Sequence, residues 1–299
     1  MYGMVHLKEW GLMAEDDMGA EFGQRAKKNG KIDDGFHMTN WDYGGDTTIN
    51  PQSGIFLTTD LPSRRGHIWS TSSLPKDGWK VIFEFKVGNN KGGFLNGDGF
   101  AFWAAKERGT SGPVFGNRDY FSGLGIFFDT YQNGAKPKNF PIVVGMVGDG
   151  TKPYDNESDG IKGSIGHCES IYFRNLESPS TAEILYIPGK KLSLNLAFNN
   201  QKVECFSVSG ITLPEDLFLG FSALTGQLHD VHSIVSVVTL NLSDAEKNNI
   251  YTSSDQKTTH KSNNSSFSSS FVKLLILCSV FGGCYYGYTL YSKSTSKRF

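Results

Sequence analysis

Two short segments join an apolar, strand-like run to acidic and amide side chains. The first, GDGFAFW, places Asp98 just before an apolar run, and the second, FFDTYQN, places Asp129, Tyr131 and Asn133 at or after the end of one. A buried strand with oxygen donors at its end can hold a hard cation or bind sugar hydroxyls. Neither segment contains a His or Cys that could act as a nucleophile. The residue types therefore predict a binding site rather than covalent chemistry.

The spacing of Asp129, Tyr131 and Asn133 suits a calcium site. The two side chains can turn to one side of the chain, with the Tyr131 carbonyl between them. Calcium takes about six to eight oxygen ligands, so further ligands must come from elsewhere. The acidic, glycine-punctuated loop 148–160 offers Asp149, Asp155 and Asp159. A solvated turn rich in Asx residues is the alternative interpretation of that loop, and the residues alone leave both open.

Alternation of polar and apolar residues predicts the strands that would position these side chains. Segments 79–87 and 191–198 carry apolar residues at every second position. Further strands are predicted at 100–105, 124–128, 142–147, 170–174, 182–187, 218–223 and 234–242. Many short strands separated by turn residues are typical of an all-β, antiparallel two-sheet sandwich of jelly-roll type. We expect this domain to span 35–242.

The sequence changes character on both sides of that domain. Residues 1–34 lack the apolar core of a signal peptide, which leaves open an incomplete start or insertion through a C-terminal anchor alone. Residues 243–270, rich in Ser, Asn, Lys and Thr, predict a flexible luminal stalk. The apolar segment 271–291 predicts one transmembrane helix, and the basic tail 292–299 favours a cytosolic C-terminus.

Charge and cysteine usage narrow the class of protein. With 299 residues and a formal net charge of -1, the chain lacks the basic excess that a nucleic-acid partner requires. Cys168 and Cys205 both lie within the predicted domain. If that domain is luminal they can pair, which would stabilise the fold by roughly 3–4 kcal/mol in the chain-entropy model. Two free buried thiols are the alternative, and spacing alone does not decide between them.

Four segments, in this order, resemble the L-type (leguminous-type) lectins of the animal and fungal secretory pathway. They are GDGFAFW, GPVFGNRDYFSGLGIFFDTYQN, YDNESDG and LTGQLHDVHSIVS. The likeness covers 41–242 and is greatest to the vesicular integral-membrane and intermediate-compartment mannose lectins of that family. It implies a legume-lectin-like jelly roll that binds sugar next to a calcium ion.

The resemblance also implies roles for individual positions. The calcium ligands that it implies are Asp129, Tyr131 through its carbonyl, Asn133 and Asp159. The carbohydrate contacts that it implies are Asp98, Asn133, Asn156, Gly226, Gln227 and Leu228. Calcium would fix Asn133, so that Asp98 and Asn133 hydrogen-bond adjacent hydroxyls. A disulfide between Cys168 and Cys205 and a cis peptide bond before Asp98 are implied as well.

Two positions depart from the family's pattern. Asn156 stands where relatives carry His after Tyr-Asp, and it begins an Asn-Glu-Ser sequon whose glycan would crowd the mouth of the site. Gln227 replaces a small or acidic residue. We therefore expect the affinity for mannose, or the preferred mannose arm, to differ from that of relatives.

These features predict a calcium-dependent mannose lectin that acts as a cargo receptor in the endoplasmic reticulum, the ER–Golgi intermediate compartment and the Golgi. It would be a single-pass type I membrane protein that binds high-mannose N-glycans on cargo glycoproteins and contacts a vesicle coat through its tail. A glycan-independent adaptor with a degenerate sugar site is the alternative. A jelly-roll glycoside hydrolase is disfavoured because the sequence has no Glu-x-Asp-x-Glu run to supply facing carboxylates.

Overall fold

Strand β8 (Gly99–Ala105) is buried along its whole length, and its alternate side chains enter two hydrophobic layers. Phe100 and Phe102 belong to the larger cluster, whereas Trp103 belongs to a second cluster. A strand with both faces buried shows no alternation of polar and apolar residues. This is why the residues after Gly99, which include the FAFW of GDGFAFW, form a continuous apolar run.

The computed structural model describes residues 27–28, 31–32, 40–89, 96–134 and 139–242. The predicted stalk, transmembrane helix and tail lie outside the described residues, as does most of 1–34. Within the described ranges, no helix is long and apolar enough to cross a membrane. The chain divides into two units, Met1–Ser243 and Asp244–Phe299, and the first contains all of the described residues.

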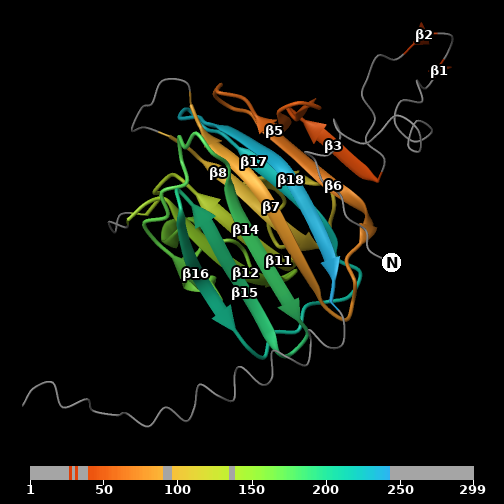
Figure 1. Ribbon diagram of the computed structural model, residues 1–299, viewed down its shortest axis with the longest axis vertical. Helices are drawn as coiled ribbons and strands as arrows, with labels where there is room; N and C mark the ends of the chain where they lie inside the picture. Colours follow the sequence, from red (N-terminus) through yellow and green to blue (C-terminus); the bar gives the residue numbers. More distant parts are fainter. Residues whose placement is uncertain (1–26, 29–30, 33–39, 90–95, 135–138, 243–299) are drawn as a thin grey trace, which may run out of the picture. The chain divides into compact units, whose positions relative to one another are not determined.

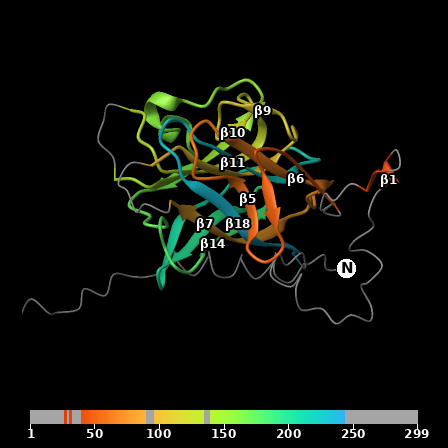
Figure 2. The same cartoon turned by 90° about the horizontal axis from the view of Figure 1, so that it is seen from above.

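Two seven-stranded antiparallel sheets, face to face in Figures 1 and 2, form this unit and confirm the predicted all-β two-sheet sandwich. One sheet is called the front sheet from here on, although it lies behind the other sheet in the view of Figure 1. In spatial order, it contains β13 (Gly166–Cys168), β12 (Ile142–Asp149), β11 (Ser122–Asp129), β8, β17 (Phe218–Leu224), β6 (Arg65–Ser73) and β3 (Trp41–Gly45). The back sheet contains β16 (Gln201–Val208), β15 (Lys191–Phe198), β14 (Ser180–Ile187), β7 (Trp79–Gly88), β18 (Val231–Asn241), β5 (Gly54–Thr58) and β4 (Thr48–Asn50). The shorter elements are β1 (Lys27–Lys28) paired with β2 (Lys31–Ile32), β9 (Ser111–Gly112) paired with β10 (Gly116–Asn117), and the 3-10 turns η2 (Asn156–Ser158) and η3 (Ile161–Gly163).

Phenylalanine rings fill the space between the two sheets. Phe83 of β7 stacks on Phe102 of β8 at a centroid distance of 5.8 Å and meets Phe221 of β17 edge-on at 4.9 Å. Phe100 of β8 stacks on Phe128 of β11 at 4.4 Å. Each such pair contributes about 0.5–1.5 kcal/mol beyond its buried area. The strands that lead to Asp98 and Asp129 are thus held firmly against the back sheet.

A second aromatic layer lies on the other face of the front sheet. Phe127 of β11 contacts Trp103 at 5.5 Å and Tyr154 at 4.9 Å, both edge-on. Tyr154 belongs to the connection between β12 and β13, whose helical turn lies outside the front sheet in Figure 2. This ring therefore anchors the loop that leads to Asp159.

One predicted strand is wrong and several strands were not predicted. Residues 170–174 form no strand; they contribute a single isolated bridge, between Arg174 and Val87. Ile171 and Phe173 are buried in the core, so their alternation imitates a strand. Strands β3, β4, β5, β6, β13 and β16 of the two sheets were absent from the prediction, as were the two-residue strands β1, β2, β9 and β10.

Cys168 of β13 and Cys205 of β16 form a disulfide with a Cα–Cα distance of 5.1 Å, as the resemblance implied. β13 and β16 are edge strands of the front and back sheets, respectively. The bond therefore ties the two sheets together along one side of the sandwich.

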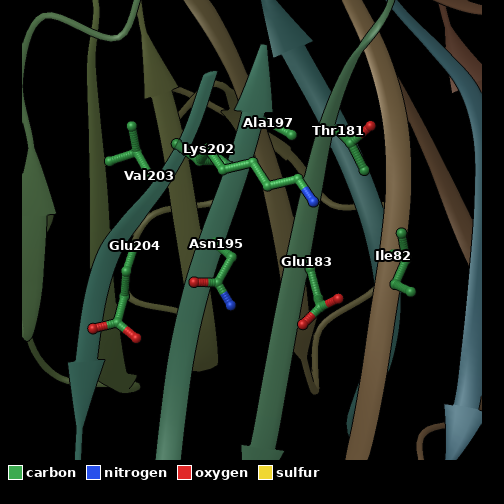
Figure 3. Close-up of a pocket in the computed structure, with 9 residues that line it drawn as sticks. Ile82, Thr181, Glu183, Asn195, Ala197, Lys202, Val203 and Glu204 are labelled. Atoms are coloured by element: carbon green, nitrogen blue, oxygen red, sulfur yellow. The ribbon is translucent and has the colours of Figure 1, made fainter. Parts of the chain in front are cut away.

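A depression of about 500 Å³ lies over β7, β14, β15 and β16 of the back sheet. Figure 3 shows that Lys202, Glu204, Asn195 and Glu183, among its lining residues, project their side chains from one face of these strands. Because Val81 and Phe83 of β7 point into the core, Ile82 between them points outward. The depression is therefore on the outer face of the back sheet and contains none of the predicted site residues.

Candidate functional site

Long-range strand pairing brings distant parts of the sequence to one end of the front sheet. Gly99 of β8 lies opposite Asp129 of β11 on one side and opposite Leu224 of β17 on the other. The Asp98 N–H donates to the Leu224 carbonyl at 3.1 Å, and the Thr130 N–H donates to the Asp98 carbonyl at 3.1 Å. Asp98 therefore sits between the turn that follows β11 and the loop that follows β17.

Asp98 presents a partly buried carboxylate at this point. The Gly97–Asp98 peptide bond is cis, as the resemblance implied. Burial raises the pKa of the Asp98 carboxyl from 3.8 to about 6. Among the described residues, no donor forms a hydrogen bond with either carboxylate oxygen, so no such bond offsets that rise. The group is a pair of acceptors that two hydroxyl donors of a ligand would satisfy.

Glycines leave room beside this carboxylate. A Cβ at Gly226 would lie 3.3 Å from Oδ1 of Asp98, closer than most such contacts. A Cβ at Gly97 would lie 3.4 Å from Cβ of Tyr131 and 3.6 Å from Cβ of Leu228. Tyr131, which is 40% exposed, and Leu228 therefore flank the segment that carries Asp98. The structure thus brings four of the predicted residues into one small space.

Two buried carboxylates form the other half of the site. Asp129 is 1% exposed, and its Oδ1 accepts a hydrogen bond from the Tyr131 N–H at 2.9 Å. Asp159 is 0% exposed, and its Oδ1 accepts from the Asn133 N–H at 2.8 Å. The Asn133 amide also donates to the Tyr131 carbonyl at 3.5 Å. The turn after β11 is therefore fastened to the loop that carries Asp159, which brings the predicted calcium ligands together.

The pKa of the Tyr154 hydroxyl reflects the negative charge in this half of the site. Burial raises the pKa of its hydroxyl well above the usual value, and the charges of Asp129, Asp159 and Asp155 raise it further. Negative charge is thus concentrated in a poorly solvated place, where a divalent cation would offset it. Two carboxylates, a carbonyl and an amide are oxygen ligands of the kind that calcium prefers, so the donor set fits calcium. Among the described residues, no three His, Cys, Asp or Glu side chains converge as a metal cluster, and this set holds only two carboxylates.

The structure separates the three candidate ligands of the loop 148–160. Asp149 pairs with Ser122, whereas Asp129 pairs with Ile142, so Asp149 lies at the opposite end of β11 and β12. Hydrogen bonds from Thr151 lower the pKa of Asp149 to about 2. Asp155 caps η2 by accepting from the Glu157 N–H at 3.1 Å. Of the three, only Asp159 reaches Asn133.

The remaining predicted sugar contacts lie on the two flanking loops. Asn156 is exposed in η2, three residues before Asp159, and Gln227 is exposed between Gly226 and Leu228. Asn156 therefore neighbours the buried carboxylate half of the site, and Gln227 neighbours the Asp98 half. The structure gives neither side chain a hydrogen bond to Asp98.

One segment that borders the site carries no recognisable signal in its sequence. The Ser63 N–H donates to the Gly226 carbonyl at 2.9 Å, and the Arg64 N–H donates to the Thr225 hydroxyl at 2.8 Å. That hydroxyl donates in turn to the Leu61 carbonyl at 2.9 Å, across a separation of 164 residues. Exposed Ser63 therefore lies beside the loop 225–230, and only the tertiary fold reveals that the two segments are neighbours.

A buried ion pair holds the far end of the same loop. The Arg174 guanidinium donates through Nε and Nη2 to the two carboxylate oxygens of Asp230, each at 2.8 Å. Asp230 is 0% exposed, and its carbonyl accepts from the Thr58 hydroxyl at 3.1 Å. Burial raises the pKa of Asp230, and Arg174 opposes that rise. The loop 225–230 is thus fixed at both ends.

The two histidines near this loop have separate partners. His229 Nδ1 lies 2.6 Å from Oδ1 of Asp60. His232 is 0% exposed, and its Nδ1 lies 2.7 Å from the Thr58 hydroxyl. Burial, followed by the charge of Arg174, lowers the pKa of His232 to about 3. His232 is thus a neutral core residue at physiological pH.

Comparison with known proteins identifies the family. The model of the legume-like lectin family matches residues 26–249. The chain belongs to the legume-like lectin family. Its membership agrees with the two-sheet sandwich and with the order of the four sequence segments.

This legume-like lectin has similar relatives in yeast and in mammals. It is 37% identical over 218 residues to an L-type lectin-like domain-containing protein of Schizosaccharomyces pombe, which covers 72% of this chain and 69% of that protein. It is 35% identical over 202 residues to the human vesicular integral-membrane protein VIP36, which covers 67% of this chain and 56% of VIP36. The chain therefore spans little more than half the length of VIP36.

Solved structures of VIP36 share the fold of this lectin. The Ca2+-bound exoplasmic/lumenal domain has a TM-score of 0.65 at 33% identity and covers 69% of this chain and 85% of that domain. The Ca2+/Man2-bound form has a TM-score of 0.64 at 32% identity and covers 71% and 86%, respectively. Those names record calcium and mannose bound to VIP36.

Proposed function

We propose that this chain is a calcium-dependent lectin that binds mannose between Asp98 and Asn133. The observation that carries the proposal is the Asp98 carboxylate, which is partly buried and receives no hydrogen bond from any described residue. It lies next to a turn that the buried Asp159 holds in place through Asn133. Paired acceptors beside a fixed amide suit adjacent hydroxyl groups of a sugar.

The residues divide the work of binding between them. Asp129, the Tyr131 carbonyl, Asn133 and Asp159 would hold calcium, which supplies positive charge and rigidity to this turn. Asp98 would accept hydrogen bonds from two neighbouring hydroxyls. The Asn133 side-chain amide, which donates to the Tyr131 carbonyl at 3.5 Å, would contribute a further polar contact. The close approach of Gly226 to Asp98 would let the backbone after β17 border the sugar.

The family and the sequence outside the described residues support a proposal for the cellular role. VIP36 is named as a vesicular integral-membrane protein with a lumenal domain, and this supports a place in the secretory pathway. We infer that segment 271–291 anchors the chain as a type I protein of the ER, the intermediate compartment or the Golgi. High-mannose N-glycans on cargo glycoproteins would then be the ligands, and the tail 292–299 would contact a vesicle coat.

A glycoside hydrolase is the weaker alternative. Hydrolysis requires two carboxyl groups that face the sugar from opposite sides. Asp129, the acidic residue paired across from the start of β8, is 1% exposed and turned towards the Tyr131 N–H. It is therefore placed to ligate a cation rather than to activate water.

A glycan array tests the proposal. The full-length chain, made without N-linked glycans, is probed in calcium and again in a calcium chelator, alongside Asp98→Asn, Asn133→Ala and Asp149→Asn. We expect binding of mannose-terminated glycans that is lost in chelator and in the first two variants. Asp149→Asn changes a carboxylate at the other end of the front sheet and should bind normally. A blank array from protein with a normal unfolding transition would contradict the lectin proposal and favour the glycan-independent adaptor.

A further inference from the structure

The sequon Asn156-Glu157-Ser158 coincides with the turn η2. The turn is held from inside: the Asp155 carboxylate accepts from the Glu157 N–H at 3.1 Å and from the Ser158 hydroxyl at 3.0 Å. The Asn156 carbonyl accepts from the Asp159 N–H at 3.2 Å. The backbone of Asn156 is thus part of the turn, while the residue itself is exposed to solvent. A modified Asn156 side chain is compatible with this fold.

The turn also forms a border of the candidate sugar site. A Cβ at Gly134 would collide with the Glu157 carbonyl oxygen, so η2 is in close contact with the chain just after Asn133. Just after the turn, Oδ1 of Asp159 accepts a hydrogen bond from the Asn133 N–H at 2.8 Å. Asn156 therefore belongs to a turn that contacts Gly134 and leads to Asp159, so a group attached to its side chain would lie near the Asn133 side of the site.

We propose that Asn156 carries an N-linked glycan and that this glycan closes the sugar site to glycans on other proteins. The inference rests on the proposed mannose site, because a closed site must first exist. The other sequons begin at Asn241, Asn263 and Asn264, outside the residues assigned to the site. Among the sequons in the described residues, only the one at Asn156 borders the site, because Asn241 lies at the other end of β18 from the loop 225–230.

The modification is an ordinary transfer reaction of the secretory pathway. Nδ2 of Asn156 bonds to C1 of the reducing-end sugar of an oligosaccharide carried on a lipid pyrophosphate, and the C1–O bond to pyrophosphate breaks. The lipid pyrophosphate leaves with the bonding electron pair, and the amide loses one proton to a base of the transferase. Exposure of Asn156 leaves the added sugar in water, so the fold need not change to accept it.

Closure follows from size and chemistry. The first sugars of the glycan would be held within a few bond lengths of the η2 backbone, next to Asn133. They are bulky and strongly hydrated, and they would occupy the space through which an external mannose must approach Asp98. Molecules that escape glycosylation at Asn156 would bind, and glycosylated ones would not, so sequon occupancy would set the active fraction.

The test uses the full-length chain made in a eukaryotic secretory host. Peptide mass spectrometry maps the occupied sequons, and binding to immobilised yeast mannan is measured in calcium. Three samples share the wild-type polypeptide: the glycosylated protein, the same protein trimmed with an endoglycosidase that leaves one sugar on Asn, and protein made while N-glycan synthesis is inhibited. Asn241→Gln, which removes a remote sequon at the end of β18, is the matched control.

We expect glycan-modified Asn156 peptides, and an affinity for mannan that rises at least tenfold in the glycan-free protein, with an intermediate value after trimming. Asn241→Gln should bind like the glycosylated wild type. Unmodified Asn156 in the mature chain would overturn the proposal, and so would equal binding by the three samples when Asn156 is occupied. If Asn156 is occupied but no sample binds mannan with or without calcium, the mannose proposal fails and closure fails with it, while the mapped modification stands.

Discussion

Replacing Asp98 by Asn should abolish sugar binding and at the same time stabilise the calcium-free fold. At pH 7 the wild-type carboxylate is ionised in a partly buried place that favours its neutral form, as its pKa of about 6 indicates. Asn has nearly the same shape and no charge to desolvate. The variant therefore removes an unfavourable term from the folded state, together with the acceptor pair that the sugar needs.

The magnitude follows from the rise in pKa. A rise from 3.8 to about 6 corresponds to roughly 3 kcal/mol, at about 1.4 kcal/mol for each pH unit. Asp98 keeps some contact with water, which screens its charge, so we expect about 1–2 kcal/mol at pH 7. Between pH 3.8 and 6 the Asp98 carboxyl binds more protons in the folded state than in the unfolded state, so its contribution to stability falls as pH rises through this window. The advantage of Asn should therefore shrink towards zero as pH falls from 7 to 4.

The assay is urea unfolding of the full-length chain in detergent micelles and calcium chelator, from pH 4 to 7.5. A chelator is required because a calcium ion in the adjacent turn would favour the ionised carboxylate. Asp149→Asn serves as the control: hydrogen bonds from Thr151 lower the pKa of that exposed carboxyl, so its removal should bring no gain. The reasoning is refuted if Asp98→Asn is less stable than the wild type at pH 7, or if its advantage does not change with pH.

Three further predictions concern other parts of the molecule. Asp159→Asn keeps an acceptor for the Asn133 N–H but removes a buried charge, so calcium affinity by isothermal titration should fall at least tenfold with little loss of stability; unchanged affinity would exclude Asp159 as a ligand. Cys168→Ser with Cys205→Ser should lower the free energy of unfolding by about 3–4 kcal/mol in urea, and a loss below 1 kcal/mol would mean that the bond constrains little. Burial lowers the pKa of His232 to about 3, so between pH 6.5 and 3 its imidazole binds a proton in the unfolded state but not in the folded state. This group alone should lower the free energy of unfolding by roughly 2 kcal/mol between pH 7 and 5. His232→Gln should therefore lose less stability than the wild type over that range, by about the same amount, and equal pH dependence of the two proteins would contradict the assignment.

Much of the sandwich was predictable from the local pattern of apolar residues. The prediction failed where burial of side chains and strand pairing do not coincide. β7 alternates because one face is buried, and β8 is uniformly apolar because both faces are buried, so both were found. β16 is an edge strand whose first four residues are exposed or only partly buried, so it lacks a hydrophobic pattern to read. Segment 170–174 shows the reverse error, because Ile171 and Phe173 pack in the core without continuous strand pairing.

The candidate site likewise contains residues that the sequence pattern indicated and residues that only the fold brings together. Asp129, Tyr131 and Asn133 are near neighbours in sequence, so their spacing alone indicated oxygen ligands. Asp98 and Ser63 join them only through strand register and loop contacts between residues far apart in the chain. The choice of Asp159 over Asp149 depends on which end of β12 each residue occupies, and spacing carries no information about that.

The disulfide links the two sheets covalently along one side of the sandwich only. Cys168 and Cys205 fasten the edge strands β13 and β16, whereas β3 and β4, at the other edges of the two sheets, have no covalent link between them. When the two sheets separate transiently, β3 and β4 should move apart first, while β13 and β16 stay joined by the disulfide. In the front sheet, counted from the edge that carries the disulfide, β11 is the third strand and β8 the fourth. A separation that starts at β3 and β4 can therefore leave the strands next to Asp98 and Asp129 in place.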